Sequence, residues 1–354
     1  MTESDTPSEI QSDIPRIAYP DVRNRDYQVG KMDIDMELGT LWPLVVTVLV
    51  SILCILFLWA RAVAYRKKRS LRAELAGIEG FANPNPSPGS GSTGVDQRMD
   101  DSCYDAFYAR VYDHLVQPIA RAPLETQVSL EVLTKTGKPV GDIRVADIGS
   151  GTGLHVELFA KQGVRSVIGY DKSTEMITES KRRFPERDFI VGDATVATMA
   201  TADQFDLVTL NYFTVYMVPD RTQMLKNIFL WLAPGGALVC HIVNKLKFDP
   251  VLESASPFVG FSVQKYADNR VTKSQVFFEE FEYEGDFQLH GSRGSYVEEF
   301  QFKDGRSRRH EQRVWMPNID VLVAEIGAVG FKYETHVDLT PIGYEYQYLF
   351  VFRK

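Results

Sequence analysis

The sequence predicts an α/β domain built on a doubly wound sheet and preceded by one membrane-spanning helix. From about residue 101 onward, short apolar or β-branched segments bounded by turns alternate with segments of helical periodicity. Strands that alternate with helices pair in parallel through right-handed crossovers, which gives an open sheet covered by helices on both faces. A separate apolar segment before residue 61 predicts the membrane helix.

The apolar segment covers residues 41–60 and contains no charged residue. Its length matches the roughly 20 residues that a helix needs to cross the hydrocarbon core. Trp42 and Trp59 stand at its two ends, where amphipathic rings favour the membrane interface. A buried core helix is the alternative, and the length and flanks disfavour it. We therefore expect a transmembrane helix over residues 41–64.

The charges on either side of this segment predict its orientation. Residues 61–75 carry six Lys or Arg side chains, whereas residues 26–40 carry one. Because basic flanks remain on the cytosolic side, we expect a single-pass membrane protein whose N-terminus is outside or lumenal and whose main domain is cytosolic.

The remaining N-terminal residues predict little regular structure. Residues 1–40 are polar and acidic, which is typical of a disordered tail. Residues 65–100 contain most of the basic flank, followed by a stretch rich in Pro, Gly, Ser and Asn. Such a composition is typical of a flexible linker. Residues 101–354 then form one domain.

Within this domain the patterns predict particular strands and helices. The expected strands are 143–148, 166–170, 188–191, 205–211, 237–243, 331–337 and 346–352. The clearest helices are 173–184, 221–232 and 318–329.

The stretch V-A-D-I-G-S-G-T-G joins the first strand to a helix through glycines. A dinucleotide-binding turn has the pattern G-x-G-x-x-G, but its third glycine would fall on Leu154. Here Gly149, Gly151 and Gly153 alternate instead, and Asp147 precedes them. An acid combined with close backbone approach suits a ligand that carries both an ammonium and a carboxylate.

Polar residues also follow the next strands. Asp171 lies 22 residues beyond Gly149, where a carboxylate can accept hydrogen bonds from ribose hydroxyls. Asp193 follows the third strand, Asn211 follows the fourth, and a P-G-G turn leads into the fifth. Ligands of such sheets bind beyond the carboxyl ends of the strands, so these residues predict one cofactor site.

In this order and at these intervals, the motifs resemble those of the class I S-adenosylmethionine-dependent methyltransferases, small-molecule type. The resemblance covers roughly residues 104–244 and, more loosely, the C-terminal helix and two strands. It implies a Rossmann-like seven-stranded sheet with an antiparallel last strand, and S-adenosyl-L-methionine as the methyl donor. The donor-binding residues that it implies are Asp147, Gly149, Gly151, Gly153, Asp171, Lys172, Met176, Asp193, Ala194, Asn211, Tyr212 and Phe213.

Some of these residues allow simpler roles. Asp193 corresponds to the family position that hydrogen-bonds the adenine amino group, but an N-cap is the alternative. Asp171 can equally be an ordinary surface acid.

Residues 245–317 exceed a simple crossover and alternate with period two, which predicts antiparallel strands after the fifth strand. In small-molecule N- and O-methyltransferases of this class, an insertion here commonly caps the substrate. We therefore expect a β-rich, substrate-capping insertion, with a sheet extension or a dimer surface as the alternative.

Two further residues are candidates for catalysis. Tyr104, Tyr108 and Tyr112 share one face of a predicted helix that resembles the family's N-terminal helix closing over the donor, and Tyr112 is the candidate there. Aromatic core packing is the alternative. His241, at the fifth strand, is a candidate general base, because a histidine pKa suits proton removal near neutrality. Its alternative is a hydrogen-bonded wall residue. The His and Cys spacings predict no metal site.

The sequence thus predicts a membrane-anchored methyltransferase that acts on N or O of a small molecule or lipid. The net charge is −8 for the chain and −2 for residues 1–100, which leaves −6 for the domain and disfavours nucleic acid as a partner. A protein or peptide methyltransferase at the membrane, a non-catalytic scaffold with this fold, and a nicotinamide enzyme are the alternatives.

Overall fold

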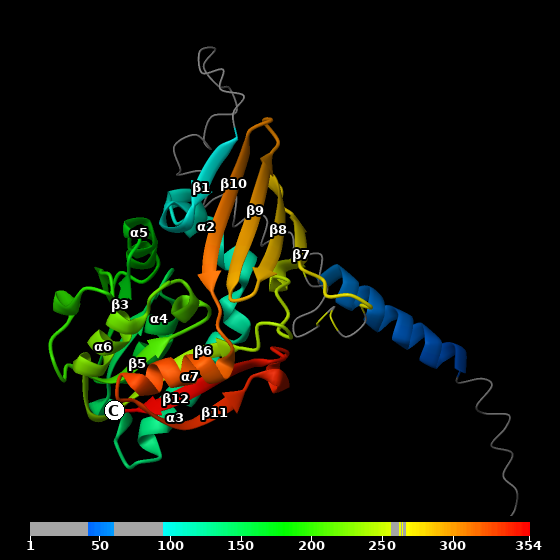
Figure 1. Ribbon diagram of the computed structural model, residues 1–354. Helices are drawn as coiled ribbons and strands as arrows, with labels where there is room; N and C mark the ends of the chain where they lie inside the picture. The colour runs from blue at the N-terminus through cyan, green and yellow to red at the C-terminus, as the bar shows by residue number, and fades with distance from the viewer. Residues whose placement is uncertain (1–41, 60–94, 256–261, 263, 265–266) are drawn as a thin grey trace, which may run out of the picture. The chain divides into compact units, whose positions relative to one another are not determined.

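The computed structural model describes residues 42–59, 95–255, 262, 264 and 267–354 (Figure 1). The chain divides into an N-terminal unit and a larger unit that contains the α/β domain. The predicted tail over residues 1–40 and the charged flanks that predict orientation lie outside the described residues.

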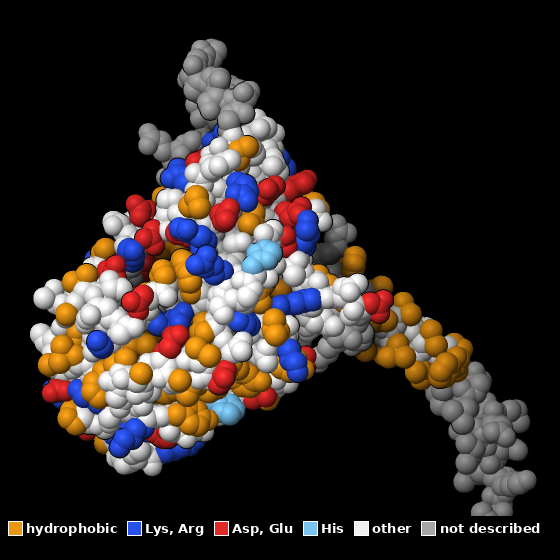
Figure 2. All heavy atoms as spheres, viewed as in Figure 1, with side chains coloured by type: hydrophobic (Ala, Val, Ile, Leu, Met, Phe, Trp, Pro, Cys, Tyr) orange, Lys and Arg blue, Asp and Glu red, His pale blue; other side chains and the backbone are white. Residues whose placement is uncertain are grey.

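One helix is described in the N-terminal unit, over Trp42–Trp59. Its mean hydropathy is 2.5 and none of it is buried within the structure. Hydrophobic side chains cover its surface in Figure 2. Its length and composition suit a membrane crossing, in agreement with the predicted helix over 41–64 where residues are described.

The main sheet of the domain has the seven strands that the sequence predicts. In order across the sheet they are β11 (Lys332–Asp338), β12 (Gln347–Arg353), β6 (Leu232–Val243), β5 (Phe205–Leu210), β2 (Arg144–Ile148), β3 (Ser166–Asp171) and β4 (Asp188–Val191). The strands from β6 to β4 are parallel, whereas β12 pairs antiparallel with both β6 and β11. The predicted doubly wound sheet with an antiparallel last strand is confirmed.

The largest difference from the predicted boundaries is at β6, which begins at Leu232 and not at residue 237. Leu232 pairs with Phe205, and after a register shift Ala237 pairs with Leu207. The P-G-G residues are therefore accommodated as an irregularity within a longer strand, because β5 continues to offer a partner on both sides of them.

Helices cover both faces of this sheet. They are α3 (Ala122–Thr134), α4 (Leu154–Lys161), α5 (Thr174–Arg183), α6 (Thr222–Trp231) and α7 (Ile319–Ala328). Along β2, Val145 belongs to the core under α3, α4 and α5, whereas its neighbour Ala146 belongs to the core under α6 and α7. Strands buried on both faces read as continuous apolar runs, which explains why the central strands show no polar alternation.

The insertion after β6 forms a second, antiparallel sheet, as predicted. Its strands are β7 (Lys273–Phe277), β8 (Phe281–His290), β9 (Arg293–Phe302) and β10 (Ser307–Trp315). In Figure 1 they stand beyond the carboxyl ends of the main strands.

A fifth strand, β1 (Asp96–Met99), pairs in parallel with the free edge of β10. The prediction of a flexible linker over 65–100 was wrong for these residues, and the rest of that linker lies outside the described residues. The pairing joins Asp96 to Arg308, more than 200 positions away. Such long-range backbone pairing leaves no local pattern in a four-residue strand.

Helix α2 (Ala106–Val116) links the second sheet to the domain. Phe107 packs edge to face on Phe281, Phe300 and Phe302, with ring centroids 5.2–5.8 Å apart. Aromatic contacts of this geometry add about 0.5–1.5 kcal/mol each beyond the area that they bury. The helix and the second sheet therefore share one hydrophobic core.

The buried Asp206 of β5 joins the beginnings of two parallel strands. It accepts hydrogen bonds from the backbone N–H and the guanidinium of Arg144 on β2, at 2.9–3.0 Å, and from Lys138 Nζ at 2.7 Å. Burial opposes ionisation, but the bonds from Arg144 and Lys138 outweigh it and lower the pKa of Asp206 to about 2.

We predict that Asp206 makes folding pH-dependent in the acid range. A lowered folded-state pKa stabilises the protein above the unfolded value of 3.8, and this contribution is lost as pH falls toward 2. It amounts to roughly 2 kcal/mol at neutral pH. Denaturant titrations of the wild type and Asp206→Asn should differ by about that amount at pH 7 and converge near pH 2. Parallel pH profiles for the two proteins would contradict this.

We also predict that Gly153→Ala destabilises the domain. Gly153 has a φ of +87°, and an added Cβ would lie 2.6 Å from Phe189 Cζ. Left-handed strain and overpacking together should lower the free energy of unfolding by about 2–4 kcal/mol. Gly163 has a similar φ of +81° but no atom within 4 Å of its added Cβ. Gly163→Ala is therefore the matched control and should cost only about 1 kcal/mol. Equal losses would contradict the packing argument.

Candidate functional site

The three glycines between β2 and α4 have positive φ but different surroundings. An added Cβ on Gly149 would lie 2.6 Å from Thr214 Oγ1, and on Gly153 it would meet Phe189. On Gly151 it would meet nothing within 4 Å. Gly149 and Gly153 thus permit close packing of the protein against itself. Gly151 leaves its backbone open to an approaching ligand.

Asp171 lies at the end of β3 and holds this turn in place. Its Oδ2 accepts a hydrogen bond from the Gly151 N–H at 2.8 Å, and its Oδ1 accepts one from the Ser173 N–H at 2.9 Å. Burial raises the pKa of Asp171 above its ordinary value. Each oxygen keeps a further lone pair, so the carboxylate can still accept hydroxyl donors from a ligand.

Asp147 and Asn211 meet at the ends of the adjacent strands β2 and β5. Asp147 is only 1% exposed, and its Oδ1 accepts hydrogen bonds from Thr209 Oγ1 at 2.7 Å and Asn211 Nδ2 at 2.9 Å. Asp147 Oδ2, Asn211 Oδ1 and Ser150 Oγ are buried without a hydrogen-bond partner. Buried polar atoms are normally paired, so two unpaired acceptors side by side fit a ligand that donates, such as an ammonium. Burial raises the pKa of Asp147, and a bound cation would counteract that shift.

Asp193 follows β4 and accepts hydrogen bonds from the Thr195 N–H at 2.9 Å and the Thr195 hydroxyl at 2.7 Å. Burial opposes ionisation, but these bonds and the charge of Lys172 lower the pKa of Asp193. Lys172 Nζ lies 3.7 Å from Asp193 Oδ2 and 2.6 Å from Asp101 Oδ2. Asp193 is thus not the helix N-cap weighed as its alternative, because the next short helix begins after Val196; it closes a turn with Thr195, and its Oδ2 faces the Lys172 side chain.

Two of the other residues implied by the resemblance are part of the hydrophobic cores. Met176 is buried in the core shared by α2 and the second sheet, and Ala194 is buried in the core under α6. Both therefore support the walls of the site through packing.

Tyr212 has a left-handed backbone, with a φ of +52°. A non-glycine residue in this region costs roughly 1–2 kcal/mol, and such residues concentrate at functional sites. Several contacts hold it there. The Arg121 guanidinium carbon lies 4.0 Å from the Tyr212 ring centroid, and Phe213 packs edge to face on the same ring. The Tyr212 carbonyl accepts a hydrogen bond from His241 Nδ1 at 2.5 Å.

His241 is fully buried behind Tyr212. Its Nε2 lies 3.1 Å from Gln347 Oε1, so both ring nitrogens are engaged. Burial lowers the pKa of His241. It is not among the residues that line the cavity described next. This geometry favours the wall role weighed for His241 and gives no support to the role of general base.

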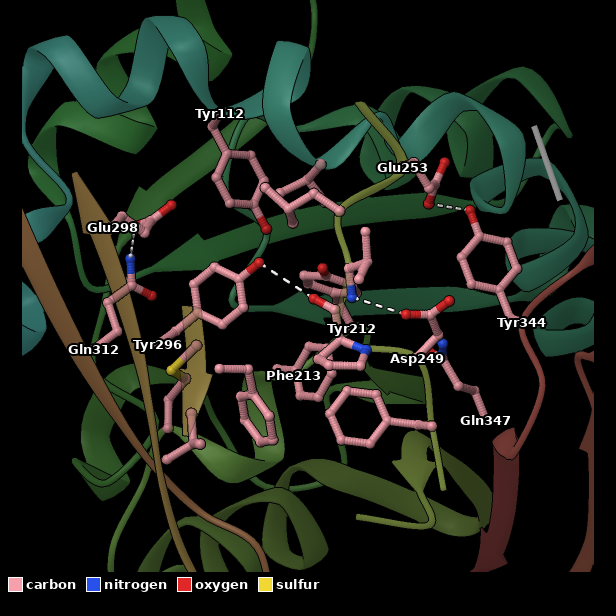
Figure 3. A pocket seen from close by; sticks show the side chains of 18 of the residues that line it. Tyr112, Tyr212, Phe213, Asp249, Glu253, Tyr296, Glu298, Gln312, Tyr344 and Gln347 are labelled. Atoms are coloured by element: carbon pink, nitrogen blue, oxygen red, sulfur yellow. Dashed lines mark hydrogen bonds between the residues drawn. The ribbon is translucent and has the colours of Figure 1, made fainter. Parts of the chain in front are cut away.

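A cavity of about 120 Å³ adjoins these residues (Figure 3). Tyr112, the other catalytic candidate, lines it, and burial raises the pKa of that tyrosine far above its usual range. The cavity is bounded by α2 and the residues before it, the turn after β5, the segment after β6, the second sheet and the segment before β12. Its lining includes Tyr104, Tyr108, Tyr112, Tyr212, Phe213, Asp249, Glu253, Tyr296, Glu298, Gln312 and Tyr344.

Two sets of buried charged residues beside this cavity were not predicted from the sequence. One is Arg121 with its partners, and the other is Glu298. Arg121 is 2% exposed and donates to Glu253 Oε1 at 3.2 Å, while Glu125 forms a pair with His155 Nε2 at 2.7 Å. Glu298 on β9 is 1% exposed. The period-two pattern offered a signal for Glu298, because it stands two positions before the buried Phe300 and hence on the same face. For the group around Arg121, the i,i+4 spacing to Glu125 was the available local signal, whereas its long-range partner Glu253 has none.

Comparisons with known proteins agree with the motifs. Residues 145–236 match the methyltransferase domain family. The chain is 36% identical over 119 residues to trans-aconitate 2-methyltransferase of Variovorax paradoxus, covering 33% of this chain and 44% of that protein. It is 36% identical over 107 residues to demethylmenaquinone methyltransferase of Renibacterium salmoninarum, covering 30% and 44%. The chain thus spans less than half the length of these relatives.

Solved structures share the fold. An S-adenosylmethionine-dependent methyltransferase from Clostridium acetobutylicum has a TM-score of 0.51 and 16% identity, covering 70% of this chain and 97% of that one. The CcbJ methyltransferase from Streptomyces caelestis has a TM-score of 0.53 and 14% identity, covering 72% and 98%.

The glycine turn, the strand-end acids, the strand order and these likenesses agree with one another. They show a methyltransferase domain over residues 145–236, within a fold shared with S-adenosylmethionine-dependent methyltransferases.

Proposed function

We propose that this protein is a membrane-anchored methyltransferase that transfers a methyl group from S-adenosyl-L-methionine to N or O of a small molecule or lipid. The observation that carries the proposal is the pair of buried, unpartnered acceptors, Asp147 Oδ2 and Asn211 Oδ1, in the same turn region as the open backbone of Gly151. Bound there, the donor would supply a methyl group on a sulfonium, ready for direct displacement by a nucleophile.

The residues at the strand ends match the groups of this donor one by one. Asp147 and Asn211 would hold its ammonium, and Gly151 would allow its amino-acid end to approach the backbone. Asp171 would accept the ribose hydroxyls with the lone pairs that Gly151 and Ser173 leave free. Asp193 would accept the adenine amino group. A dinucleotide has no ammonium for the first two residues, which favours the sulfonium donor.

The cavity beside these residues would hold the acceptor. Direct displacement needs the acceptor atom aligned with the methyl group, and a closed aromatic wall both aligns the acceptor and excludes water. Rings from α2, from the turn after β5 and from the second sheet form that wall. We therefore assign the insertion after β6 the role of substrate cap. The names of the two relatives refer to small-molecule substrates, which supports a small-molecule acceptor here.

The helix Trp42–Trp59 would anchor the protein in a membrane, with the domain on the cytosolic side. Anchoring raises the effective concentration of the enzyme near acceptors in or at that membrane without any new contact.

To separate small-molecule from protein acceptors, the full chain in detergent micelles should be incubated with methyl-labelled donor and fractionated cell extract. Label in the metabolite or lipid fraction supports the proposal, and label confined to protein would overturn its substrate class.

We predict that Gly151→Ala weakens donor binding with little loss of stability. Its Cβ would enter the open space assigned to the donor, so the dissociation constant for S-adenosylhomocysteine should rise by at least about tenfold, equivalent to about 1.4 kcal/mol. Calorimetric titration of the full chain measures this. Gly163→Ala is again the matched control, because its added Cβ also meets no atom within 4 Å but it lies outside the turn.

Three results would count against the donor assignment. One is unchanged affinity in Gly151→Ala, and another is a folded wild-type protein that binds no S-adenosylhomocysteine. The third is a preference for NAD in the same titration, which would establish a nicotinamide enzyme instead.

A further inference from the structure

The acceptor cavity is lined by aromatic rings and carboxylates. Its lining includes six tyrosines and three phenylalanines. Its charged members are Asp249, Glu253 and Glu298, and none of the described residues that line it is Lys, Arg or His. In Figure 3, Glu298 lies beside Gln312 at one side, and Asp249 and Glu253 lie at the other.

Glu298 is the most deeply buried of these carboxylates. Its Oε1 accepts hydrogen bonds from the Tyr108 hydroxyl at 2.9 Å and the Tyr283 hydroxyl at 2.8 Å. Its Oε2 accepts one from Gln312 Nε2 at 3.1 Å. All three donors are neutral, and among the described residues Glu298 forms no ion pair with a Lys or Arg.

His310 and Arg308 stand next in line behind Glu298. Because a guanidinium only donates, His310 Nε2 must accept from Arg308 Nε at 2.5 Å, and the proton of the ring then lies on Nδ1, 3.5 Å from Glu298 Oε2. Arg308 is itself paired with Asp105, with 2.8 Å between Nη2 and Oδ2. The nearest positive charge behind Glu298 is therefore the Arg308 guanidinium, and Asp105 already neutralises it.

The other two acids differ from Glu298, Glu253 because it has an ion pair and Asp249 because it is partly exposed. Glu253 is paired with Arg121 at 3.2 Å and accepts a hydrogen bond from Tyr344. Asp249 is only half-buried and accepts hydrogen bonds from Ser262 at 2.6 Å and Gln264 at 2.9 Å. Glu298 is thus the buried carboxylate of the cavity whose charge the protein does not match.

We propose that the acceptor is an amine, recognised in its ammonium form by Glu298 and the surrounding tyrosine rings. A carboxylate removed from water without a cationic partner costs several kcal/mol, and a ligand cation would offset that cost. Tyr104, Tyr108 and Tyr112 line the same cavity, and aromatic faces attract cations electrostatically. The inference rests on the proposed function for its reaction and concerns only which acceptor the cavity binds.

The same charges disfavour an anionic acceptor. A polycarboxylate such as trans-aconitate, for which one relative is named, would face three acids and, among the described lining residues, no cation. Placing like charges together in a cavity of low dielectric costs several kcal/mol. The acceptor of this chain therefore differs in charge from the one named for that relative.

Three probes of one shape test the charge preference: phenethylamine, phenethyl alcohol and phenylacetate. They are cationic, neutral and anionic at pH 7. Each is titrated by calorimetry into the full chain in detergent micelles, with S-adenosylhomocysteine present at saturation to occupy the donor site. We expect phenethylamine to bind at least about tenfold more tightly than the alcohol, and phenylacetate more weakly than both.

Two variants assign the preference to Glu298. Glu298→Gln should reduce phenethylamine affinity by at least about tenfold and leave that of the alcohol within about twofold. Glu299→Gln removes the same charge from the next residue of β9, whose side chain is 50% exposed, and should change neither. S-adenosylhomocysteine affinity and the midpoint of thermal unfolding report whether each variant is folded with an intact donor site.

Failure of this inference differs from failure of the proposed function. If S-adenosylhomocysteine binds but phenylacetate binds as well as the amine, or no probe binds, the amine acceptor is overturned and the methyltransferase stands. A preference for the amine that persists in Glu298→Gln overturns the role of Glu298. If S-adenosylhomocysteine does not bind, the proposed function fails, and the probe titrations, repeated without it, still decide the charge preference of the cavity.

Discussion

The aromatic contact between α2 and the second sheet holds together the two sides of the acceptor cavity. Phe107 packs against rings of β8 and β9, and the next residue of the helix, Tyr108, donates a hydrogen bond to Glu298. The apolar contact keeps water away from that carboxylate, while the hydrogen bond partly satisfies it. Without this contact the insertion would be a solvated sheet, and Glu298 would be an ordinary exposed acid.

The turn after β5 connects the cavity to the proposed donor site. Asn211 belongs to the pair of unpartnered acceptors, whereas the next two residues, Tyr212 and Phe213, line the cavity. Asn211 can face the proposed donor site while Tyr212 faces the cavity, because Tyr212 adopts a left-handed backbone. Buried contacts with Arg121 and His241 maintain this conformation. Changes at those two residues would therefore act on the donor and the acceptor together, although neither lines the cavity.

Local patterns predicted the main sheet well, because its signals are contained within short segments. Each parallel strand is an apolar run followed by a turn, and the acids that follow the strands meet at one edge by topology alone. The same logic identified the antiparallel insertion from its period-two alternation. For the three glycines, sequence predicted a ligand turn but did not separate Gly151, which is open, from Gly149 and Gly153, which pack against side chains distant in the chain.

Interactions between distant segments could not be predicted in this way. His241 lies at a strand end where a base would be useful, yet Tyr212 and Gln347 occupy its two nitrogens. The pair of Arg121 and Glu253 joins residues more than 100 positions apart, so no spacing in the sequence reports it. Strand β1 is also defined by a distant segment, since three of its four residues are polar and it is ordered by pairing with β10.

The pairing of β1 with β10 determines where the folded domain begins. A fragment starting at residue 101 would include every motif of the methyltransferase family but would lack β1. The hydrogen-bonding edge of β10 would then be open to other chains, which is a known route to aggregation for exposed sheet edges. Asp100, which binds Arg313, would also be missing. The autonomous folding unit thus reaches back at least to Asp96, into the stretch for which the sequence predicted a linker.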